Sequence, residues 1–274
     1  MDVYGVPEVF EHEASGSLKA VYADIQNVLK VPVVNFIFRT LASYERFLTE
    51  GWKQVRPNML TFEGKRAAEA LRCPNLRVEV PHVDWYRYYE KATLDRIRET
   101  VFTFNYVNPK LLLIASAWAE SLGNRPNSGY PKVQGTIQPG VLPELPPIDL
   151  IQISEAPQPI RTLLLDIARK HHHYEPSSDY RALARYPQFL RLGWQYLKDY
   201  VGSEEYMLLR GKLLTRSVQL TKELPYPVTV NRTLLAQYDK PAEIAGIMGI
   251  VSMFQNILPD LIIDGEFFRR LLNS

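Results

Sequence analysis

The residues best suited to chemistry form a short run, Ser177-Ser178-Asp179, at the start of a predicted helix. Unpaired N–H groups and the helix dipole favour negative charge at such an end, so the Asp179 carboxylate would stay ionised there. An ionised carboxylate in partly dry surroundings is a general base for water. The alternative is that Ser177 or Ser178 caps the helix, and that Asp179 is an exposed acid in its first turn.

Two amides, Asn105 and Asn108, lie just before Pro109. Because proline disfavours a helix before it and suits the first helical turn, the sequence predicts that one helix ends here and another begins, and it predicts the same break at Leu258-Pro259. Amides at such a break could orient a water molecule or a substrate oxygen. The alternative is that Asn108 only caps the helix that begins at Pro109.

The run His171-His172-His173 has the residue type of a metal site but not its spacing. Consecutive residues of a helix point in different directions, so we expect a solvated helix end and no metal site. The single cysteine, Cys73, allows no intramolecular disulfide and no cysteine-based zinc site. We expect it to be a small buried side chain in a reducing, cytoplasmic protein.

Composition excludes several classes of function. The chain has 274 residues, of which 46% are hydrophobic, and a net charge of only +2. The basic residues form no run, so neither nucleic acid nor a membrane surface is an expected partner. The motifs of serine esterases, phosphate-binding loops and zinc proteases are missing from the sequence.

The elements that must position these residues occur twice in the sequence. At an offset of 142 residues the segment Arg39–Trp52 falls on Arg181–Trp194, and eight of the fourteen aligned residues are identical. Further along the chain the offset becomes 150. The residues that then match are Ile97, Val101, Phe104, Pro109 and Leu111 with Ile247, Val251, Phe254, Pro259 and Leu261.

Apolar residues at helical spacing in both copies predict an all-α fold built from two tandem repeats that form a pseudo-dimer. We divide the chain into a first repeat at residues 1–124, a linker at residues 125–159 and a second repeat at residues 160–274. Eight of the chain's 20 prolines lie in the linker, which therefore cannot be a helix. The strand-like run Arg77–Val80 carries little weight beside these patterns.

The two copies differ where the chemistry is expected. At offset 142, Ile37 of the first copy faces Asp179 of the second. The isoleucine indicates that this position points into apolar surroundings. The second copy therefore places a carboxylate near an otherwise apolar interface, and the asymmetry predicts a hydrolytic site there.

Three segments carry a resemblance to a known family. The segments Val31–Arg39, Asn105–Lys110 and Ser177–Ala184 resemble the group I 2-haloacid dehalogenases, and the likeness covers nearly the whole chain. The resemblance implies an active site between the two repeats. It also implies direct attack of water on the halogen-bearing carbon, with inversion, no ester intermediate, and neither a metal nor an organic cofactor.

The same resemblance assigns residues. It implies that Asp179 is the catalytic aspartate and that Ser178 belongs to the halide cradle. Either Asn105 or Asn108 would help to hold the water, and the sequence does not decide between them.

Aromatic residues complete the cradle in this resemblance. Phe36 fits that role, whereas Val33 stands where the family pattern leads us to expect a tryptophan. The expected partner is a small carboxylate substrate, and the family makes a homodimer plausible. Two alternatives stay open: a hydrolase of another small carboxylate on the same scaffold, and a non-catalytic helical binding protein.

Overall fold

The computed structural model describes residues 6–129 and 133–273, so residues 1–5 of the first repeat, 130–132 of the linker and 274 lie outside the description. The described residues contain helices, two isolated β-bridges and no strand, and Arg77–Val80 has no regular structure. The helices before the linker are α1 (Gly16–Leu29), α2 (Phe36–Leu41), α3 (Glu45–Met59), α4 (Phe62–Arg72) and α5 (Lys91–Leu122). Those after it are α6 (Gln158–His171), α7 (Ser178–Leu183), α8 (Pro187–Leu197), α9 (Glu204–Thr221), α10 (Arg232–Leu235) and α11 (Pro241–Leu271). Two short 3₁₀ turns, η1 (Ala42–Tyr44) and η2 (Trp85–Arg87), complete the set.

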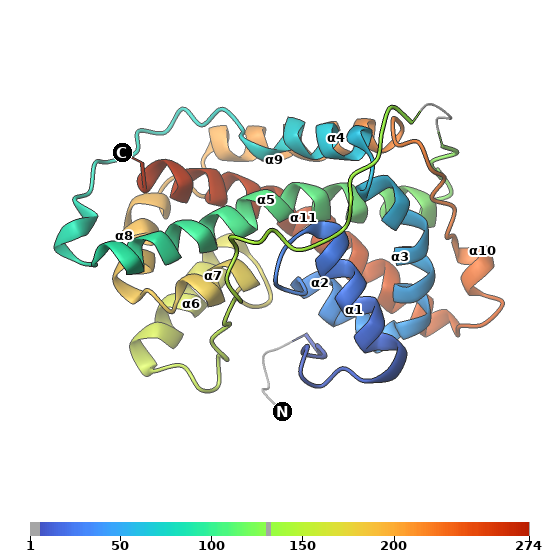
Figure 1. Cartoon of the computed structure of the whole chain (residues 1–274), viewed down its shortest axis with the longest axis horizontal. Coiled ribbons are helices and arrows are strands. Elements are labelled where there is room, and N and C mark those ends of the chain that lie inside the picture. Colours follow the sequence, from blue (N-terminus) through green and yellow to red (C-terminus); the bar gives the residue numbers. More distant parts are fainter. Residues whose placement is uncertain (1–5, 130–132, 274) are drawn as a thin grey trace.

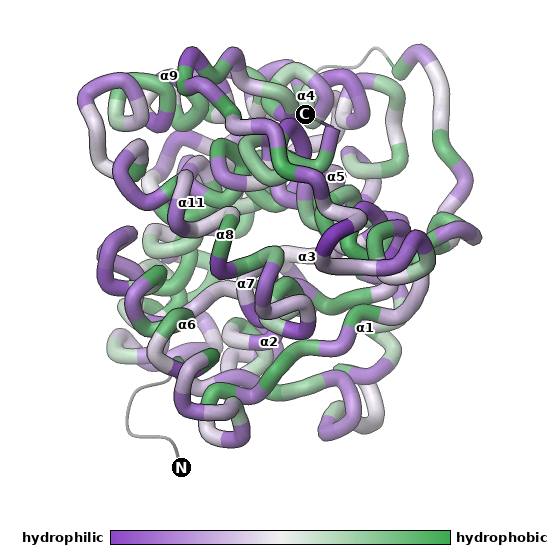
Figure 2. The backbone as a smooth tube through the Cα atoms, turned by 90° about the vertical axis from the view of Figure 1, so that its left-hand side faces the viewer, coloured by the Kyte–Doolittle hydropathy of each residue, from purple (hydrophilic) through white to green (hydrophobic). Residues whose placement is uncertain are grey.

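The two longest helices, α5 and α11, pack against each other through the middle of the protein (Figure 1). Figure 2 shows them between α4 and α9 above and α2 and α6 below. By length and composition alone α11 could cross a membrane, and half of its apolar window is buried inside the protein. The all-α class predicted from the sequence is confirmed.

The predicted helix breaks at the two prolines are wrong. Pro109 lies inside α5 and Pro259 lies inside α11, and both are buried. A proline in a helix removes one backbone hydrogen bond, here the bond to the carbonyl of Asn105 in α5. Packing of α5 against α11 outweighs this loss, because both helices bury apolar residues on either side of the proline.

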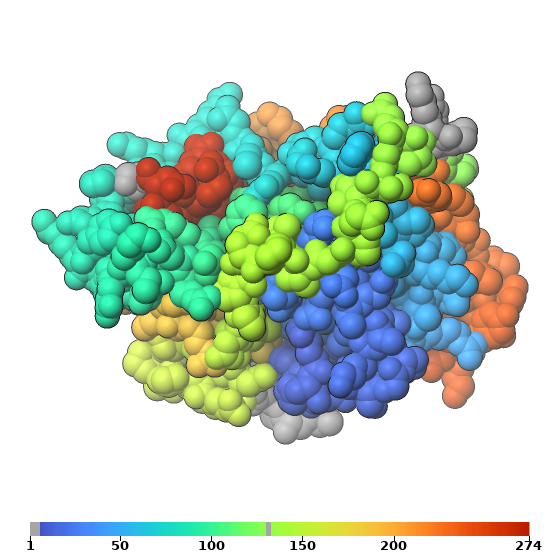
Figure 3. All heavy atoms as spheres, in the orientation of Figure 1, coloured from blue at the N-terminus to red at the C-terminus, as the bar shows by residue number. Residues whose placement is uncertain are grey.

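The linker follows the surface without forming a helix between residues 133 and 157 (Figure 3). Backbone hydrogen bonds join it first to the N-terminal helices, as from Ile137 N to Leu60 O. Further on, the N–H of Ile151 donates to the carbonyl of Arg181 in α7. The linker therefore contacts both halves of the chain. Cys73, expected to be buried, is exposed beyond the end of α4, where the chain leaves the core.

Helix bounds recur at the offsets seen in the sequence. Adding 142 to the bounds of α1 and α2 gives those of α6 and α7, and adding 150 to the first residue of α5 gives that of α11. Matched contacts recur too. Trp52 donates to Asp24 over 2.8 Å, and Trp194 donates to Asp166 over the same distance. We propose on this basis that the two halves are copies related by a pseudo-twofold axis.

A pair of matched glycines allows the helices of each half to approach closely. A Cβ on Gly51 of α3 would lie 3.1 Å from Nε1 of Trp118 in α5. A Cβ on Gly193 of α8 would lie only 2.5 Å from Cε1 of Phe268 in α11. A side chain at Gly193 therefore requires Phe268 to shift, whereas one at Gly51 requires Trp118 to give by only a few tenths of an ångström.

We expect Gly193→Ala to lower the free energy of unfolding, because overpacking costs about 1–3 kcal/mol and exceeds the gain in helix propensity. Gly51→Ala should cost less. Gly211→Ala in α9 is the matched control, since nothing lies within 4 Å of its added Cβ. Urea unfolding of the three variants checks this. A Gly193→Ala protein as stable as the Gly211→Ala protein would contradict the close approach.

Candidate active site

Asp179 is the second residue of α7, and its carboxyl group faces the interior. Neither Ser177, the N-cap residue, nor any other side chain caps this helix by a hydrogen bond. The carboxyl lines a cavity of about 20 Å³, whose walls are Val101, Phe104, Tyr180, Leu183, Leu261, Asp264, Gly265 and Phe268. This volume suits a single water molecule. The alternative in which a serine caps the helix and Asp179 is a surface acid does not describe this site.

The cavity exists because the second copy has smaller side chains than the first. At the matched offsets the first copy places Ile37, Ala115 and Trp118 where the second has Asp179, Gly265 and Phe268. All three first-copy residues are buried. Interiors are close-packed, so each reduction in side-chain size leaves space unless the neighbours move inward.

Asn108 of α5 holds the carboxyl in place. Its Nδ2 donates a hydrogen bond of 2.6 Å to Oδ1 of Asp179. A hydrogen bond from the backbone N–H of Asp179 itself also favours the ionised carboxylate. Because Asn108 has this partner, its alternative role as a helix cap is excluded, and it lies in the interior of a continuous helix.

Asn105 lies three residues earlier on the same helix and has a different set of contacts. Its Oδ1 accepts a bond of 2.9 Å from Nε of Arg72, while its buried Nδ2 has no partner among the described residues. A Cβ on Gly265 would lie 3.9 Å from that Nδ2, and Gly265 lines the cavity. Asn105 therefore offers a free donor beside the cavity.

Burial controls the charge of Asp179. Desolvation raises the pKa of its carboxyl to about 7, and the hydrogen bond from Asn108 opposes part of that rise. The sequence had suggested that the helix end keeps this group fully ionised, but burial among apolar walls has the larger effect. A carboxyl with a pKa near neutrality is suited to exchanging a proton with water.

Asp264 is a second carboxyl in the same cavity, and the sequence analysis missed it. It accepts hydrogen bonds from Tyr180 (2.6 Å) and Tyr206 (3.1 Å), and burial raises its pKa well above the usual value. Burial also lowers the pKa of the neighbouring His171 to about 3. Comparison of the copies would have found Asp264, because Ile114 stands at its place in the first copy.

Ser178 belongs to a polar network that joins the two halves. Its Oγ accepts a hydrogen bond of 3.1 Å from Nη2 of Arg39 in α2. The carboxylate of Glu8 pairs with Nε of Arg39 at 2.7 Å and with Nη1 of Arg181 at 2.8 Å. Arg39 and Arg181 are matched residues of the two copies, so one carboxylate ties α2 to α7.

Phe36 and Val33 do not line the cavity of Asp179. Phe36 packs edge-on against Phe254, with ring centroids 5.2 Å apart, and the Arg39 guanidinium lies 5.7 Å from its ring. Val33 is buried in the segment before α2. Arg39 thus lies next to both Phe36 and Ser178, and this group of residues is separate from the lining of the Asp179 cavity.

The histidine run is also placed differently from the prediction. Helix α6 ends at His171, and His172 adopts a left-handed conformation with φ of 58°. The chain therefore folds back, and the rings of His171 and His173 stack with centroids 5.0 Å apart. Only His172 is solvated, while the side chains of its two neighbours are buried.

Fold and site together define an all-α protein in which the carboxyls of Asp179 and Asp264 line a water-sized, mostly apolar cavity, an arrangement suited to hydrolysis by directly activated water. The comparisons with known proteins agree. The family model described as halocarboxylic acid dehydrogenase DehI matches residues 32–180. The chain belongs to this family, as its resemblance to the group I 2-haloacid dehalogenases implied.

Relatives match over nearly the whole chain. A configuration-inverting 2-haloacid dehalogenase from Alcaligenes xylosoxydans xylosoxydans is 29% identical over 94% of this chain and 90% of its own length. An (R)-2-haloacid dehalogenase from Pseudomonas putida is 25% identical over 95% of this chain and 90% of its own. The solved structure of a D-2-haloacid dehalogenase in complex with L-LA has a TM-score of 0.91 and 24% identity, covering 98% of this chain and 97% of its own.

We expect Asp179→Asn to raise stability above neutral pH. A raised pKa means that folding disfavours the ionised form, so wild-type stability falls as pH rises from about 4 through about 7 and is constant beyond. The uncharged amide avoids this loss. At pH 8 the variant should be more stable by on the order of 2 kcal/mol, with little difference below pH 4. Urea unfolding at both pH values checks the sign, and equal stability at pH 8 would contradict a buried, titrating carboxyl.

We expect Asn108→Leu to raise the pKa of Asp179, because it removes the hydrogen bond that favours the ionised form. In a pH profile of turnover, the midpoint of the rise should move up by about one pH unit. Asn105→Leu is the control, since Asn105 does not contact Asp179, and it should leave the midpoint unchanged. An unshifted midpoint in Asn108→Leu would contradict the assignment of Asp179 as the titrating base.

Proposed function

We propose that this protein hydrolyses the carbon–halogen bond of small 2-haloalkanoic acids, using water activated by Asp179, with inversion and no covalent intermediate. One observation carries the proposal: a carboxyl with a near-neutral pKa, held by Asn108, faces an apolar cavity that can hold one water. Family membership and the names of the relatives support the reaction.

In the proposed step Asp179 accepts a proton from the water while the water oxygen attacks C2 of the substrate. The halogen leaves as halide from the opposite side of C2, so the configuration inverts and the product is a 2-hydroxy acid. The proton then passes from Asp179 to solvent. Apolar walls strengthen this base, because they remove the competing solvation of the carboxylate.

The partners of the leaving halide are proposed around Arg39. The Oγ of Ser178 accepts a hydrogen bond from Arg39, so its own O–H remains available to donate to a halide. The Arg39 guanidinium supplies positive charge, and Phe36 supplies a polarisable ring beside it. Val33, in place of an expected tryptophan, would make this cradle less enclosed.

Substrate binding requires movement. A 2-haloacid is larger than a cavity of about 20 Å³, so the walls between α5, α7 and α11 must separate before substrate reaches Asp179. A hydrolase of another small carboxylate is the second possibility, because Val33 changes the shape expected for a halide cradle. We also propose that the protein is cytoplasmic and forms a homodimer.

We expect Asp179→Asn to fold normally and to lose halide release by about 100-fold or more, because the amide cannot accept the proton. The measurement is chloride released from each enantiomer of 2-chloropropionate, together with the configuration of the lactate formed. Circular dichroism serves as the folding control. An active Asp179→Asn protein would contradict the assignment of the base. A wild type inactive on every 2-haloacid would favour the other small-carboxylate hydrolase.

A further inference from the structure

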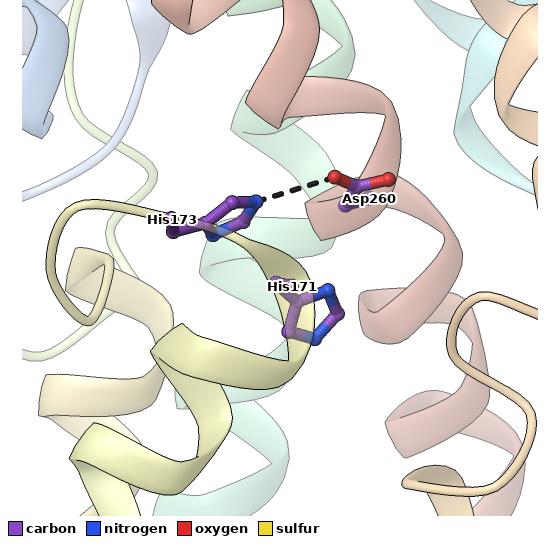
Figure 4. Close-up of side chains that lie close together, drawn as sticks. All are labelled: His171, His173 and Asp260. Carbon is purple, nitrogen blue, oxygen red and sulfur yellow. Dashed lines mark hydrogen bonds and ion pairs between the residues drawn. The ribbon is translucent and has the colours of Figure 1, made fainter.

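We propose that His171, His173 and Asp260 form a binding site for one divalent transition-metal ion, Zn²⁺ above all, on the far side of Tyr180 and Asp264 from Asp179. The three side chains bring one ligand atom each to within 4.8 Å of one another. Figure 4 shows both imidazole rings beside the Asp260 carboxylate, one from the end of α6 and one from the turn after it. Two histidines and one carboxylate are a common protein ligand set for zinc.

The distances suit an ion. Ligand atoms about 2.0–2.1 Å from a tetrahedral zinc lie about 3.3 Å from one another. Nε2 of His173 and Oδ2 of Asp260 are already 3.2 Å apart. Only the His171 ring must move closer, by about 1.5 Å or less, which small side-chain rotations provide. The side chains of His171, His173 and Asp260 are 1%, 4% and 6% exposed, so all three ligands are held by packing.

His171 carries an independent sign of a ligand. Its Nδ1 is buried and has no hydrogen-bond partner among the described residues. Its other nitrogen, Nε2, lies 3.2 Å from Oδ2 of Asp264 and 3.3 Å from the Tyr180 hydroxyl. Metal-binding histidines commonly use this arrangement, in which one nitrogen is fixed by a carboxylate and the other is left for the ion.

The first half has no such ligand set at the matched place. The residues that match His171, His173 and Asp260 are Leu29, Val31 and Lys110. The ammonium group of Lys110 donates to the carbonyl of Leu29 over 2.8 Å. The second half therefore has two imidazoles and a carboxylate where the first has two apolar side chains and an amine.

Arg210 pairs with Asp260 but leaves one oxygen of its carboxylate available to an ion. Its Nε is 2.9 Å from Oδ1 of Asp260, the oxygen that His173 does not contact. The contact counts as an ion pair rather than a well-aligned hydrogen bond, because Oδ1 has no bond of good geometry. Oδ2 remains available to an ion, and the Arg210 side chain, which is 26% exposed, also donates from Nη2 to the carbonyl of Asn256 over 2.8 Å.

An ion can reach the site from solvent. His171, His173, Arg210 and Asp260 line a groove of about 1140 Å³ between α6, α9 and α11, and Asp179 is not among its lining residues. Three protein ligands leave a fourth position toward this groove for water or a small anion. His171 would connect the ion to Asp264, and Asp264 lines the Asp179 cavity.

The test is zinc binding by tag-free protein freed of metal with a chelator, measured by equilibrium dialysis and by calorimetry. Wild type should bind one zinc ion per chain and unfold at a higher temperature with zinc present. His173→Asn should weaken binding by about 100-fold or more, since it removes a ligand. His172→Asn is the matched control, because His172 is exposed and its left-handed conformation suits asparagine.

Asp260→Asn provides a second loss of a ligand in a nearly isosteric form, should His173→Asn fold poorly. Cobalt(II) adds a spectroscopic readout, since its visible absorption reports nitrogen and oxygen ligation and should vanish in both variants. Wild type that binds no zinc would overturn the proposal. Binding that is equal in His173→Asn, Asp260→Asn and wild type would equally overturn it, because the ion would then lie elsewhere. None of these readouts depends on dehalogenase activity.

Discussion

The structure depends on one costly interaction, the burial of the Asp179 carboxyl between α5 and α11. Desolvation opposes its charge, and a single side-chain hydrogen bond from Asn108 offsets part of that cost. The balance places the pKa near 7, where the group can take a proton from water and return it. Other features of the site serve this balance: an unbroken α5 that carries Asn108, a short α7 that presents Asp179, and apolar walls that limit the water.

We propose that a duplicated scaffold makes such a site tolerable. The first copy fills the matched space with Ile37, Ile114 and Trp118, all fully buried, and so contributes ordinary core packing. The second copy gives up that packing for polar groups and a hollow. Stability lost at a functional site is commonly recovered elsewhere, and here the Glu8 carboxylate pairs with matched arginines from both copies.

Much of the architecture was readable from the sequence, because apolar spacing and a repeat offset are properties of the chain itself. The all-α class followed from apolar spacing, and the exceptional position of Asp179 followed from comparing the copies. The helix breaks predicted at Pro109 and Pro259 are wrong, because the packing of α5 against α11 overrides the local preference of proline. Cys73 was predicted to be buried but is exposed, because it follows the last residue of α4, where the chain leaves the core.

The site itself was only partly predictable. Asn108 and Asn105 could not be separated until the helix phase showed which amide reaches Asp179. Phe36 was assigned by resemblance, and its distance from the cavity depends on tertiary packing with Phe254. The histidine run was judged as part of a helix, but the left-handed His172 turns the chain so that its neighbours stack. A backbone reversal of one residue leaves no signal in hydrophobic periodicity.

The central claim, direct attack by water held at Asp179, is tested most directly by a single turnover in ¹⁸O-labelled water with enzyme in excess over 2-chloropropionate. The account predicts that the lactate from this first turnover carries the heavy oxygen and that the protein carries none. If the first lactate instead contains unlabelled oxygen, and the label appears in the carboxyl of Asp179, the reaction passes through an aspartyl ester. That result would contradict the account.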